Sequence, residues 1–302
     1  MEERSRLEII ETIKELAEPL EVEPTGEQPR LKQIKGIKAV VFDVYGTMML
    51  SGSGDIGLTA QDDLKADAFE KAAAQFNLRE AEDMAEDAVE LLQKIKLEVH
   101  EEATGRGVDK AEVVIEEIWQ EVFEGLEEPG CMVSLPDQNT LLKFCAAYEC
   151  RVNPTWLVPG LEKTLNTIAG QNLTLGIVSN AQFFTRYLFD AYLDKSLVEF
   201  GFQESLMVWS YLLRVAKPSL SIYTPLLFNI EKEHGIKPGE ILYVGNDMLN
   251  DIYPAHALGM KTALFAGDQR SLRLREEDER CAGLEADLVI TEMPQLLEVL
   301  EN

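Results

Sequence analysis

Cysteine and histidine are scarce in this chain. Its 302 residues include four cysteines and three histidines. The cysteines do not show the tight Cys-x-x-Cys spacing of a structural metal site. The first residues, MEERSRLEII, lack the long apolar core of a secretory signal peptide. Together these absences favour a protein of the reducing cytoplasm.

Basic charge and long apolar runs are also lacking. The chain has 28 basic and 54 acidic residues, which gives a formal charge of −26. Nonspecific binding to a nucleic-acid backbone depends on clustered lysine and arginine, so this balance argues against a nucleic-acid partner. No apolar run approaches the roughly 18 residues that suggest a membrane span. We therefore expect no nucleic acid and no membrane as partners, and a small-molecule substrate in a locally electropositive pocket.

The composition is that of a globular protein, with 46% apolar and 27% charged residues, and the length exceeds one average domain. Near the start, Ile9, Ile13, Leu16 and Leu20 recur at helical spacing, and the linker-like segment EVEPTGEQPR follows. We expect residues 1–36 to be an N-terminal helical extension whose apolar stripe packs on its own chain. Contact with a second copy, in a homo-oligomer, stays open as the alternative.

Within residues 51–156, the stretch from about residue 59 to 150 has a helical pattern and no convincing strand. Ile115 and Trp119 lie on one apolar stripe, in a helix for which Asp109 and Glu112 predict a capping box. We therefore expect a separate helical domain over this range, inserted after the first strand.

The remaining segments, residues 37–50 and 157–302, alternate between short apolar runs and helices. The runs include AVVFD, LTLGIVSN, SLMVWS, EILYVGND and KTALFAG. Such alternation predicts an α/β core with a doubly wound parallel sheet and helices on both faces. In sheets of this kind, ligands bind at the carboxyl ends of the strands.

Polar side chains stand at the ends of three of these runs, and a lysine stands before a proline at a predicted helix start. These residues are Asp43, Ser179, Asn180, Lys217, Asn246 and Asp247. Because the carboxyl ends of parallel strands share one edge of the sheet, we expect these side chains to meet there.

In order along the chain, the segments FDVYGT, IVSN, AKPS and VGNDMLNDI resemble the four motifs of the haloacid dehalogenase-like (HAD) hydrolase superfamily. Each segment alone is a weak signal, and their order and places together are a strong one. The resemblance covers residues 38–302 and implies a Rossmannoid core with a helical cap domain. It also implies that the protein is a hydrolase. The leading expectation is a Mg²⁺-dependent phosphatase that acts on a small phosphorylated metabolite through an aspartyl-phosphate intermediate.

The resemblance assigns a role to each residue of the substrate site. Asp43 would be the nucleophile, and Lys217 would neutralise the charge that gathers around it. The transferred group would be held by Thr47, Ser179 and Asn180.

The same resemblance implies a set of oxygen ligands for Mg²⁺. Asp43 and the main-chain oxygen of Tyr45 would bind the ion, and Asp251 would orient metal-bound water. The position that usually holds the first acidic residue of the fourth motif is Asn246 in this chain. Either Asn246 or Asp247 would therefore complete the metal site.

Tyr45 is the second departure from the phosphatase pattern. The residue at this position is usually an aspartate that protonates the leaving alcohol, whereas a tyrosine with an ordinary pKa of about 10 is a poor proton donor at neutral pH. A DxYGT motif is instead the pattern of 2-haloacid dehalogenases, in which halide leaves without a proton. Arg79 would then be the candidate for gripping the substrate carboxylate, and in a phosphatase Asp55 would be a candidate replacement acid.

Two alternatives to the phosphatase therefore stay open. One is a 2-haloacid dehalogenase-type hydrolase, which would need no metal. The other is a HAD-fold protein that binds ligands or partners with little turnover.

Overall fold

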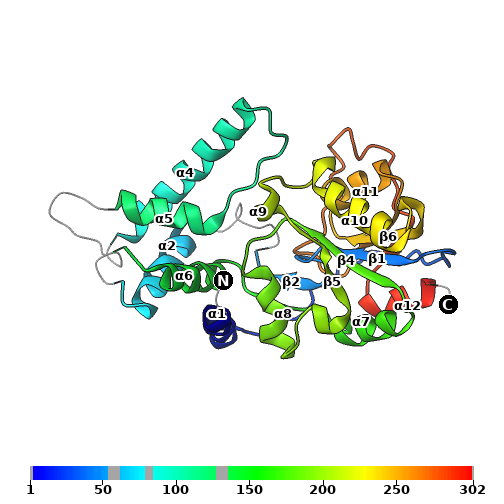
Figure 1. Cartoon of the computed structure of the whole chain (residues 1–302), viewed down its shortest axis with the longest axis horizontal. Coiled ribbons are helices and arrows are strands. Elements are labelled where there is room, and N and C mark those ends of the chain that lie inside the picture. Colours follow the sequence, from blue (N-terminus) through cyan, green and yellow to red (C-terminus); the bar gives the residue numbers. More distant parts are fainter. Residues whose placement is uncertain (1–2, 54–61, 79–83, 127–134, 301–302) are drawn as a thin grey trace.

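The computed structural model describes residues 3–53, 62–78, 84–126 and 135–300. Figure 1 shows two parts, a parallel sheet flanked by helices and a group of helices beside it. The predicted candidates Asp55 and Arg79 lie outside the described residues. Within the described ranges we find no helix that could span a membrane.

The sheet has six strands, all parallel, in the order β5-β4-β1-β6-β7-β8. Its strands are β1 (Ala39–Phe42), β4 (Thr174–Ser179), β5 (Phe202–Trp209), β6 (Ile241–Gly245), β7 (Lys261–Phe265) and β8 (Leu288–Ile290). The chain builds outward from β1 to β5 and then returns to the other side of β1 with β6. This order confirms the doubly wound α/β fold that the sequence predicted.

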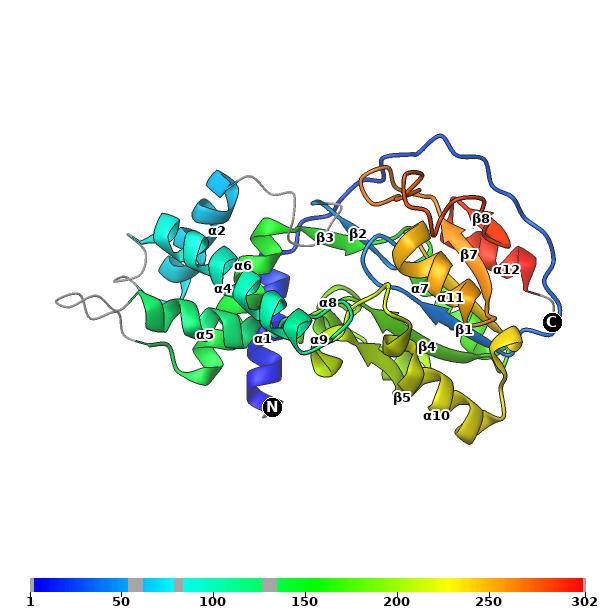
Figure 2. The same cartoon turned by 90° about the horizontal axis from the view of Figure 1, so that it is seen from above.

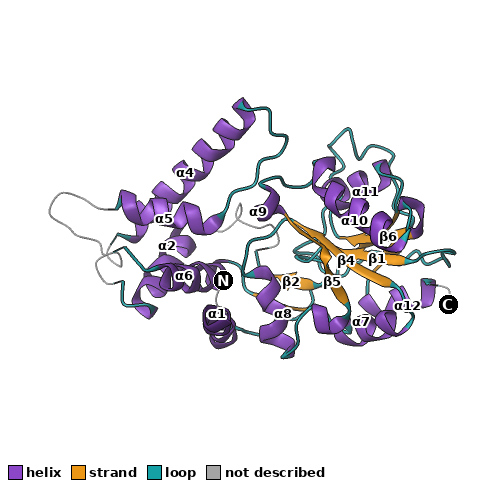
Figure 3. Ribbon diagram, viewed as in Figure 1, coloured by secondary structure: helices purple, strands orange, loops and turns teal. Residues whose placement is uncertain are grey.

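Helices cover both faces of the sheet and form the group beside it (Figure 3). They are α1 (Glu3–Leu16), α2 (Asp62–Gln75), α4 (Ala85–Gly105), α5 (Ile115–Gly125), α6 (Gln138–Val152), α7 (Leu161–Gly170), α8 (Thr185–Leu193), α9 (Ser210–Leu213), α10 (Thr224–His234), α11 (Tyr253–Ala257) and α12 (Leu296–Val299). The short turns are η1 (Val198–Phe200), η2 (Leu220–Tyr223), η3 (Pro238–Glu240), η4 (Met248–Ile252, a turn of π-helix) and η5 (Met293–Gln295).

Successive side chains of the central strand β1 point to opposite faces of the sheet, and all four are buried. The strand is therefore covered on both faces. Ala39 and Val41 belong to the apolar cluster that includes residues of α10, whereas Val40 and Phe42 belong to the cluster that includes residues of α7 and α8. In Figure 1, α10 and α11 lie above the sheet and α7, α8 and α12 lie below it. A strand buried on both faces reads as a continuous apolar run, as AVVF does.

The helical group consists of α2, α4, α5 and α6 together with the described residues that connect them, and we call it the cap segment. Its core is aromatic: the ring of Trp119 contacts those of Phe69, Phe144 and Tyr148 at centroid distances of 5.6, 5.1 and 4.7 Å. Trp119 lies on the predicted stripe of α5, which is buried, so that prediction is confirmed. The outer limits of this segment as a domain stay a prediction.

A two-stranded antiparallel sheet connects the cap segment to the parallel sheet. Its strands are β2 (Met49–Ser51) and β3 (Thr155–Leu157), and Leu50 pairs with Trp156. The chain therefore leaves the core and returns to it side by side, and both crossings lie just beyond the end of β1.

The N-terminal helix α1 packs against both α6 of the cap segment and α8 of the core. Its residues Ile9 and Ile13 are fully buried, so the predicted packing of the apolar stripe on its own chain is confirmed. Glu8 pairs with Lys143 of α6, and Arg6 pairs with Asp190 of α8. A homo-oligomer through this helix stays a prediction.

After α1 the chain runs around the outside of the core toward α12, as the dark blue trace in Figure 2 shows. Arg30 forms an antiparallel bridge with Val289 of β8, and Ile34 pairs with Leu300. The extension is thus hydrogen-bonded to the core at its far edge.

Candidate active site

The polar ends of the strands meet, as predicted, in a cavity of about 200 Å³ at the carboxyl edge of the sheet. The predicted site residues that line it are Asp43, Tyr45, Asn180, Lys217, Asn246, Asp247 and Asp251. They come from the ends of β1, β4 and β6, from η4 and from the segment after α9.

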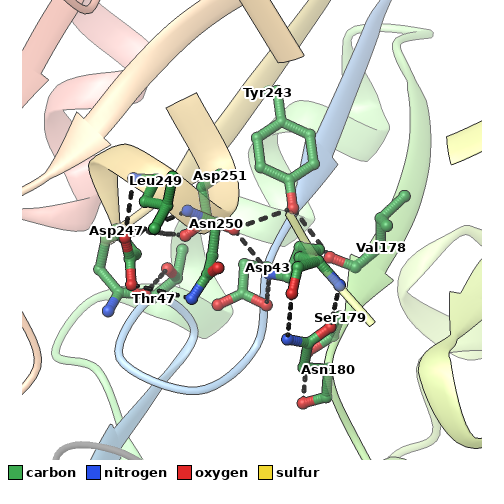
Figure 4. A network of polar contacts seen from close by, with 12 residues as sticks. Asp43, Thr47, Val178, Ser179, Asn180, Tyr243, Asp247, Leu249, Asn250 and Asp251 are labelled. Carbon is green, nitrogen blue, oxygen red and sulfur yellow. Dashed lines mark hydrogen bonds and ion pairs between the residues drawn. The ribbon is translucent and has the colours of Figure 1, made fainter. Parts of the chain in front are cut away.

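Two buried carboxylates share one buried lysine at the base of this cavity. The Nζ atom of Lys217 lies 2.6 Å from Oδ1 of Asp43 and 2.6 Å from Oδ1 of Asp251. The three side chains are 8% exposed or less. Figure 4 shows Asp43 and Asp251 approaching this point from different segments. Taking an ammonium group out of water is costly, and this paired geometry offsets that cost.

Burial and charge act in opposite directions on these groups. Burial alone lowers the pKa of Lys217, but the charges of Asp251 and Asp43 outweigh it and leave the pKa above its ordinary value. Burial raises the pKa of Asp251 to about 7, although the Lys217 ammonium opposes the shift. The ammonium is therefore held in its charged form beside Asp43.

Asp251 also organises the start of η4. Its Oδ2 atom accepts hydrogen bonds from the main-chain N–H groups of Asn246 (3.1 Å) and Asp247 (3.0 Å). A Cβ atom at Gly245 would lie 2.3 Å from Cγ of Asp251, so this close approach needs a glycine. The glycine of the fourth motif thus allows Asp251 to reach back to the tip of β6.

Asn246 is held by two hydrogen bonds. Its Oδ1 accepts from the Thr47 hydroxyl at 2.9 Å, and its Nδ2 donates to the main-chain oxygen of Ser271 at 2.7 Å. The tip of β1 is therefore joined to the tip of β6 through Thr47, which is buried and does not line the cavity.

Asp247 has its carboxylate fully engaged. It caps η4 by accepting from the main-chain N–H groups of Leu249 (2.8 Å) and Asn250 (3.1 Å). The guanidinium of Arg275 donates to both of its oxygens, at 2.7 Å for the shortest contact. The same segment places Arg273 on the cavity wall. Neither arginine could be predicted as a site residue, because this segment lies in neither a motif nor a helical pattern.

The oxygens at this edge are of the kind that Mg²⁺ prefers. Among the described residues we find no hydrogen-bond donor to Oδ2 of Asp43, and the side-chain oxygen of Asn246 keeps a second lone pair. We also find no preformed group of three or more acidic, histidine or cysteine side chains arranged to hold a metal in the described part of the chain. The residues therefore fit an ion held by one or two protein groups and completed by phosphate and water.

Tyr45 lies on the cavity wall and its hydroxyl lies 2.9 Å from Oγ1 of Thr185. Burial, together with the nearby Glu149 carboxylate, raises its pKa well above the ordinary value of 10.0. This shift makes Tyr45 a still poorer proton donor than the sequence suggested.

Asn180 and Ser179 end β4 but differ in what they do. The Oδ1 atom of Asn180 accepts from the main-chain N–H of Lys217 at 2.7 Å, so Asn180 holds the segment that carries the lysine. Ser179 is fully buried, and its hydroxyl donates to the main-chain oxygen of Asn180 at 3.4 Å. It does not line the cavity.

The cap segment contributes two carboxyl groups that the sequence did not place in the site. Glu112 and Glu149 both line the cavity, and burial raises the pKa of each. The predicted capping box of Asp109 and Glu112 is wrong, because α5 begins only at Ile115. Glu112 instead accepts a hydrogen bond from the core residue Ser210 at 2.7 Å.

Comparison with known proteins agrees with the motifs and the fold. Over 146 residues the chain is 35% identical to the glyceraldehyde 3-phosphate phosphatase of Pyrococcus furiosus, a match that covers 48% of this chain and 55% of that protein. The chain thus spans about half the length of this curated relative. No protein-family model matches the chain.

Among solved structures, the fold is similar to that of 2-haloacid dehalogenase from Pseudomonas syringae pv. Tomato DC3000. The TM-score is 0.54 at 20% sequence identity, and the likeness covers 87% of this chain and 97% of that one. This likeness shows the fold. The chain is thus similar in fold to a haloacid dehalogenase, and residues of its four motif segments line a cavity at the carboxyl edge of its parallel sheet.

Proposed function

We propose that this chain is a Mg²⁺-dependent phosphohydrolase that acts on a small phosphorylated metabolite and uses Asp43 as its nucleophile. The observation that carries the proposal is the buried contact of 2.6 Å between Lys217 and Asp43. It leaves Oδ2 of Asp43 without a hydrogen-bond donor among the described residues and fixes a positive charge beside the carboxylate. A cation in this place stabilises negative charge that gathers on a transferred phosphoryl group.

In the first step, an oxygen of Asp43 forms a bond to phosphorus while the bond from phosphorus to the leaving oxygen breaks. In the second step, water attacks the aspartyl phosphate, inorganic phosphate leaves and the carboxylate is restored. Lys217 neutralises charge at Asp43 throughout. Asn180 keeps Lys217 in place through its hydrogen bond to the main chain.

Mg²⁺ would neutralise phosphate charge and orient it toward the nucleophile. We infer that Asp43, the main-chain oxygen of Tyr45 and the side-chain oxygen of Asn246 would hold the ion, with Asp251 orienting its water. Asn246 is favoured over Asp247 because both oxygens of Asp247 already accept hydrogen bonds from Arg275.

The substrate would be a compact phosphate ester. The cavity of about 200 Å³ is smaller than the roughly 300–1,000 Å³ of drug-sized pockets. The relative named as a glyceraldehyde 3-phosphate phosphatase makes three-carbon phosphates the first substrates to test.

The dehalogenase alternative is disfavoured by the charges on the cap side of the cavity. A 2-haloacid carries a carboxylate, and the described residues that the cap segment contributes to the wall include Glu112 and Glu149 but no lysine or arginine. A dehalogenase would need a cation to grip this carboxylate, and these two carboxyl groups supply none.

The test is an assay of phosphate release from p-nitrophenyl phosphate and glyceraldehyde 3-phosphate beside chloride release from 2-chloropropionate, each with EDTA or with added Mg²⁺. We expect phosphate release that stops with EDTA and returns with Mg²⁺, and no chloride release. Chloride release that persists in EDTA, without phosphate release, contradicts the proposal and supports the dehalogenase. Silence in both assays, with measurable Mg²⁺ binding, supports the binding protein with little turnover.

A further inference from the structure

A short stretch of the cap segment is hydrogen-bonded to the core beside the catalytic lysine. Residues 110–112 run antiparallel to residues 214–216, and Ala111 bridges Val215. The main-chain N–H of Ala216 donates to the oxygen of Lys110 at 2.7 Å, and that of Glu112 donates to the oxygen of Arg214 at 3.1 Å. We call residues 110–112 the strap. It is paired with the residues that lead directly into Lys217.

The side chain of Glu112 extends this contact to a second core loop. One oxygen accepts from the hydroxyl of Ser210 at 2.7 Å, and Ser210 in turn accepts from the main-chain N–H of Ala181 at 2.9 Å. The other oxygen accepts from Nε2 of Gln182 at 3.4 Å, and that nitrogen also donates to the oxygen of Val113 at 3.0 Å. Glu112 therefore contacts the loop after β4 and the start of α9 together.

Both of these core segments carry residues of the proposed site. The loop after β4 begins with Asn180, and the segment after α9 carries Lys217; the two are joined by the 2.7 Å bond from the Lys217 main chain to Asn180. Glu112 lies on the wall of the same cavity. A group that binds both segments at once can fix the distance between Asn180, Lys217 and the cap segment.

We propose that Glu112 is a positioning residue, which couples the seating of the cap segment to the placement of Lys217. The inference rests on the proposed hydrolytic function for its kinetic consequence, but its structural part does not. When the cap segment is seated, the strap pairs with residues 214–216 and Glu112 binds Ser210. When it is displaced, these bonds are lost together, and Lys217 is no longer held against Asp43.

The chain offers a matched control on the same strip of surface. Glu117 of α5 pairs with Arg214 at 2.6 Å, but these side chains are 49% and 55% exposed. This pair joins the same two segments without touching the cavity. Glu117→Gln removes it and should leave the placement of Lys217 unchanged, because exposed ion pairs contribute little.

The kinetic test compares the variants with p-nitrophenyl phosphate at saturating Mg²⁺. We expect Glu112→Ala to lower kcat about 10-fold or more with a smaller change in KM, because small displacements of a catalytic group cost the transition state most. Glu112→Gln should recover most of the loss, since its amide oxygen still accepts from Ser210. Ser210→Ala should lower kcat by about as much as Glu112→Ala does. The variant with both substitutions should have a kcat no lower than that of either single variant.

An activity-independent test follows the amide hydrogen exchange of Ala216 and Lys217. We expect faster exchange at both in Glu112→Ala and in Ser210→Ala, and no change in Glu117→Gln. If Glu112→Ala does not fold, Ser210→Ala carries both tests. The proposal is overturned if the kcat of Glu112→Ala stays within about twofold of the wild type. It is also overturned if the losses in kcat multiply in the double variant, or if the amide exchange of Ala216 and Lys217 is unchanged in Glu112→Ala. If the wild type releases no phosphate, the proposed function fails, and exchange alone decides whether Glu112 positions Lys217.

Discussion

The Nζ atom of Lys217 lies 2.6 Å from Oδ1 of Asp43, and the lysine is shared with Asp251 at the same distance. Because all three groups are buried, removing the lysine leaves two carboxylates without a counter-charge. We expect Lys217→Ala to lower the free energy of unfolding by about 3–5 kcal/mol, measured by urea denaturation.

The control for this change is the exposed lysine Lys71, whose ion pair with Asp67 should contribute less than about 1 kcal/mol. Adding Asp251→Asn to Lys217→Ala should restore part of the stability, because it removes one unpaired charge. A Lys217→Ala variant as stable as Lys71→Ala would contradict the buried ion pair.

Tyr45 should give the enzyme a preference for leaving groups that need no proton. The raised pKa and the contact with Thr185 keep its hydroxyl protonated and engaged. We expect kcat/KM to be at least about 10-fold higher for p-nitrophenyl phosphate than for glycerol 3-phosphate, since general acid catalysis contributes about 100-fold or more where it operates. Tyr45→Asp should narrow this gap, and Tyr45→Phe should leave it unchanged. An equal preference in the wild type would mean that another group supplies the proton.

Glu149 should select against substrates that carry a second negative charge. Its carboxyl lies on the cavity wall, where burial raises its pKa and the Lys96 ammonium acts against that shift. We expect Glu149→Gln to improve kcat/KM for 2-phosphoglycolate relative to glyceraldehyde 3-phosphate by about 5- to 10-fold, or about 1 kcal/mol. Glu121→Gln, an exposed change on α5, should leave the ratio as it is. If this ratio of kcat/KM values is the same in Glu149→Gln as in the wild type, the leaving group of the substrate does not bind beside Glu149.

The same substitution should stabilise the protein at neutral pH. Burial raises the pKa of Glu149 above its ordinary value of 4.5, although Lys96 opposes the shift. The folded state therefore binds a proton more tightly than the unfolded state, and stability falls as pH rises above 4.5 toward the folded pKa. Glutamine cannot ionise, so Glu149→Gln should have a higher Tm than the wild type at pH 8 and an equal Tm below pH 4.5. A lower Tm at pH 8 would show that the attraction to Lys96 outweighs the cost of burial.

The α/β core and its polar edge could be predicted from the sequence because they depend on local patterns. The run AVVF reads as a strand buried on both faces, and Asp43 follows it directly. Once the sheet is parallel, geometry alone brings Asp43, Asn180 and Asn246 to one edge. The apolar stripe of α5 could be predicted for a similar reason, since helical spacing places its apolar residues on one face.

The cap side of the site could not be predicted, because it depends on contacts between distant segments. The pairing of Leu50 with Trp156 joins two three-residue strands that lie on either side of the cap segment, and neither has a pattern of its own. Glu112 matched a local capping pattern with Asp109, but pairing of its main chain with Arg214 took precedence. Arg275 and its contact with Asp247 likewise depend on the path of a loop.

The most direct test of the account is phosphate release by Asp43→Asn beside the wild type, with Mg²⁺ present. The amide is close in size to the carboxylate but cannot attack phosphorus, so turnover should fall by at least about 1,000-fold while the Tm changes little. Intact mass spectrometry of rapidly acid-quenched wild type should also show a phosphoryl adduct that this variant lacks. Substantial phosphate release by Asp43→Asn, or an adduct that persists in it, would contradict the assignment of Asp43 as the nucleophile.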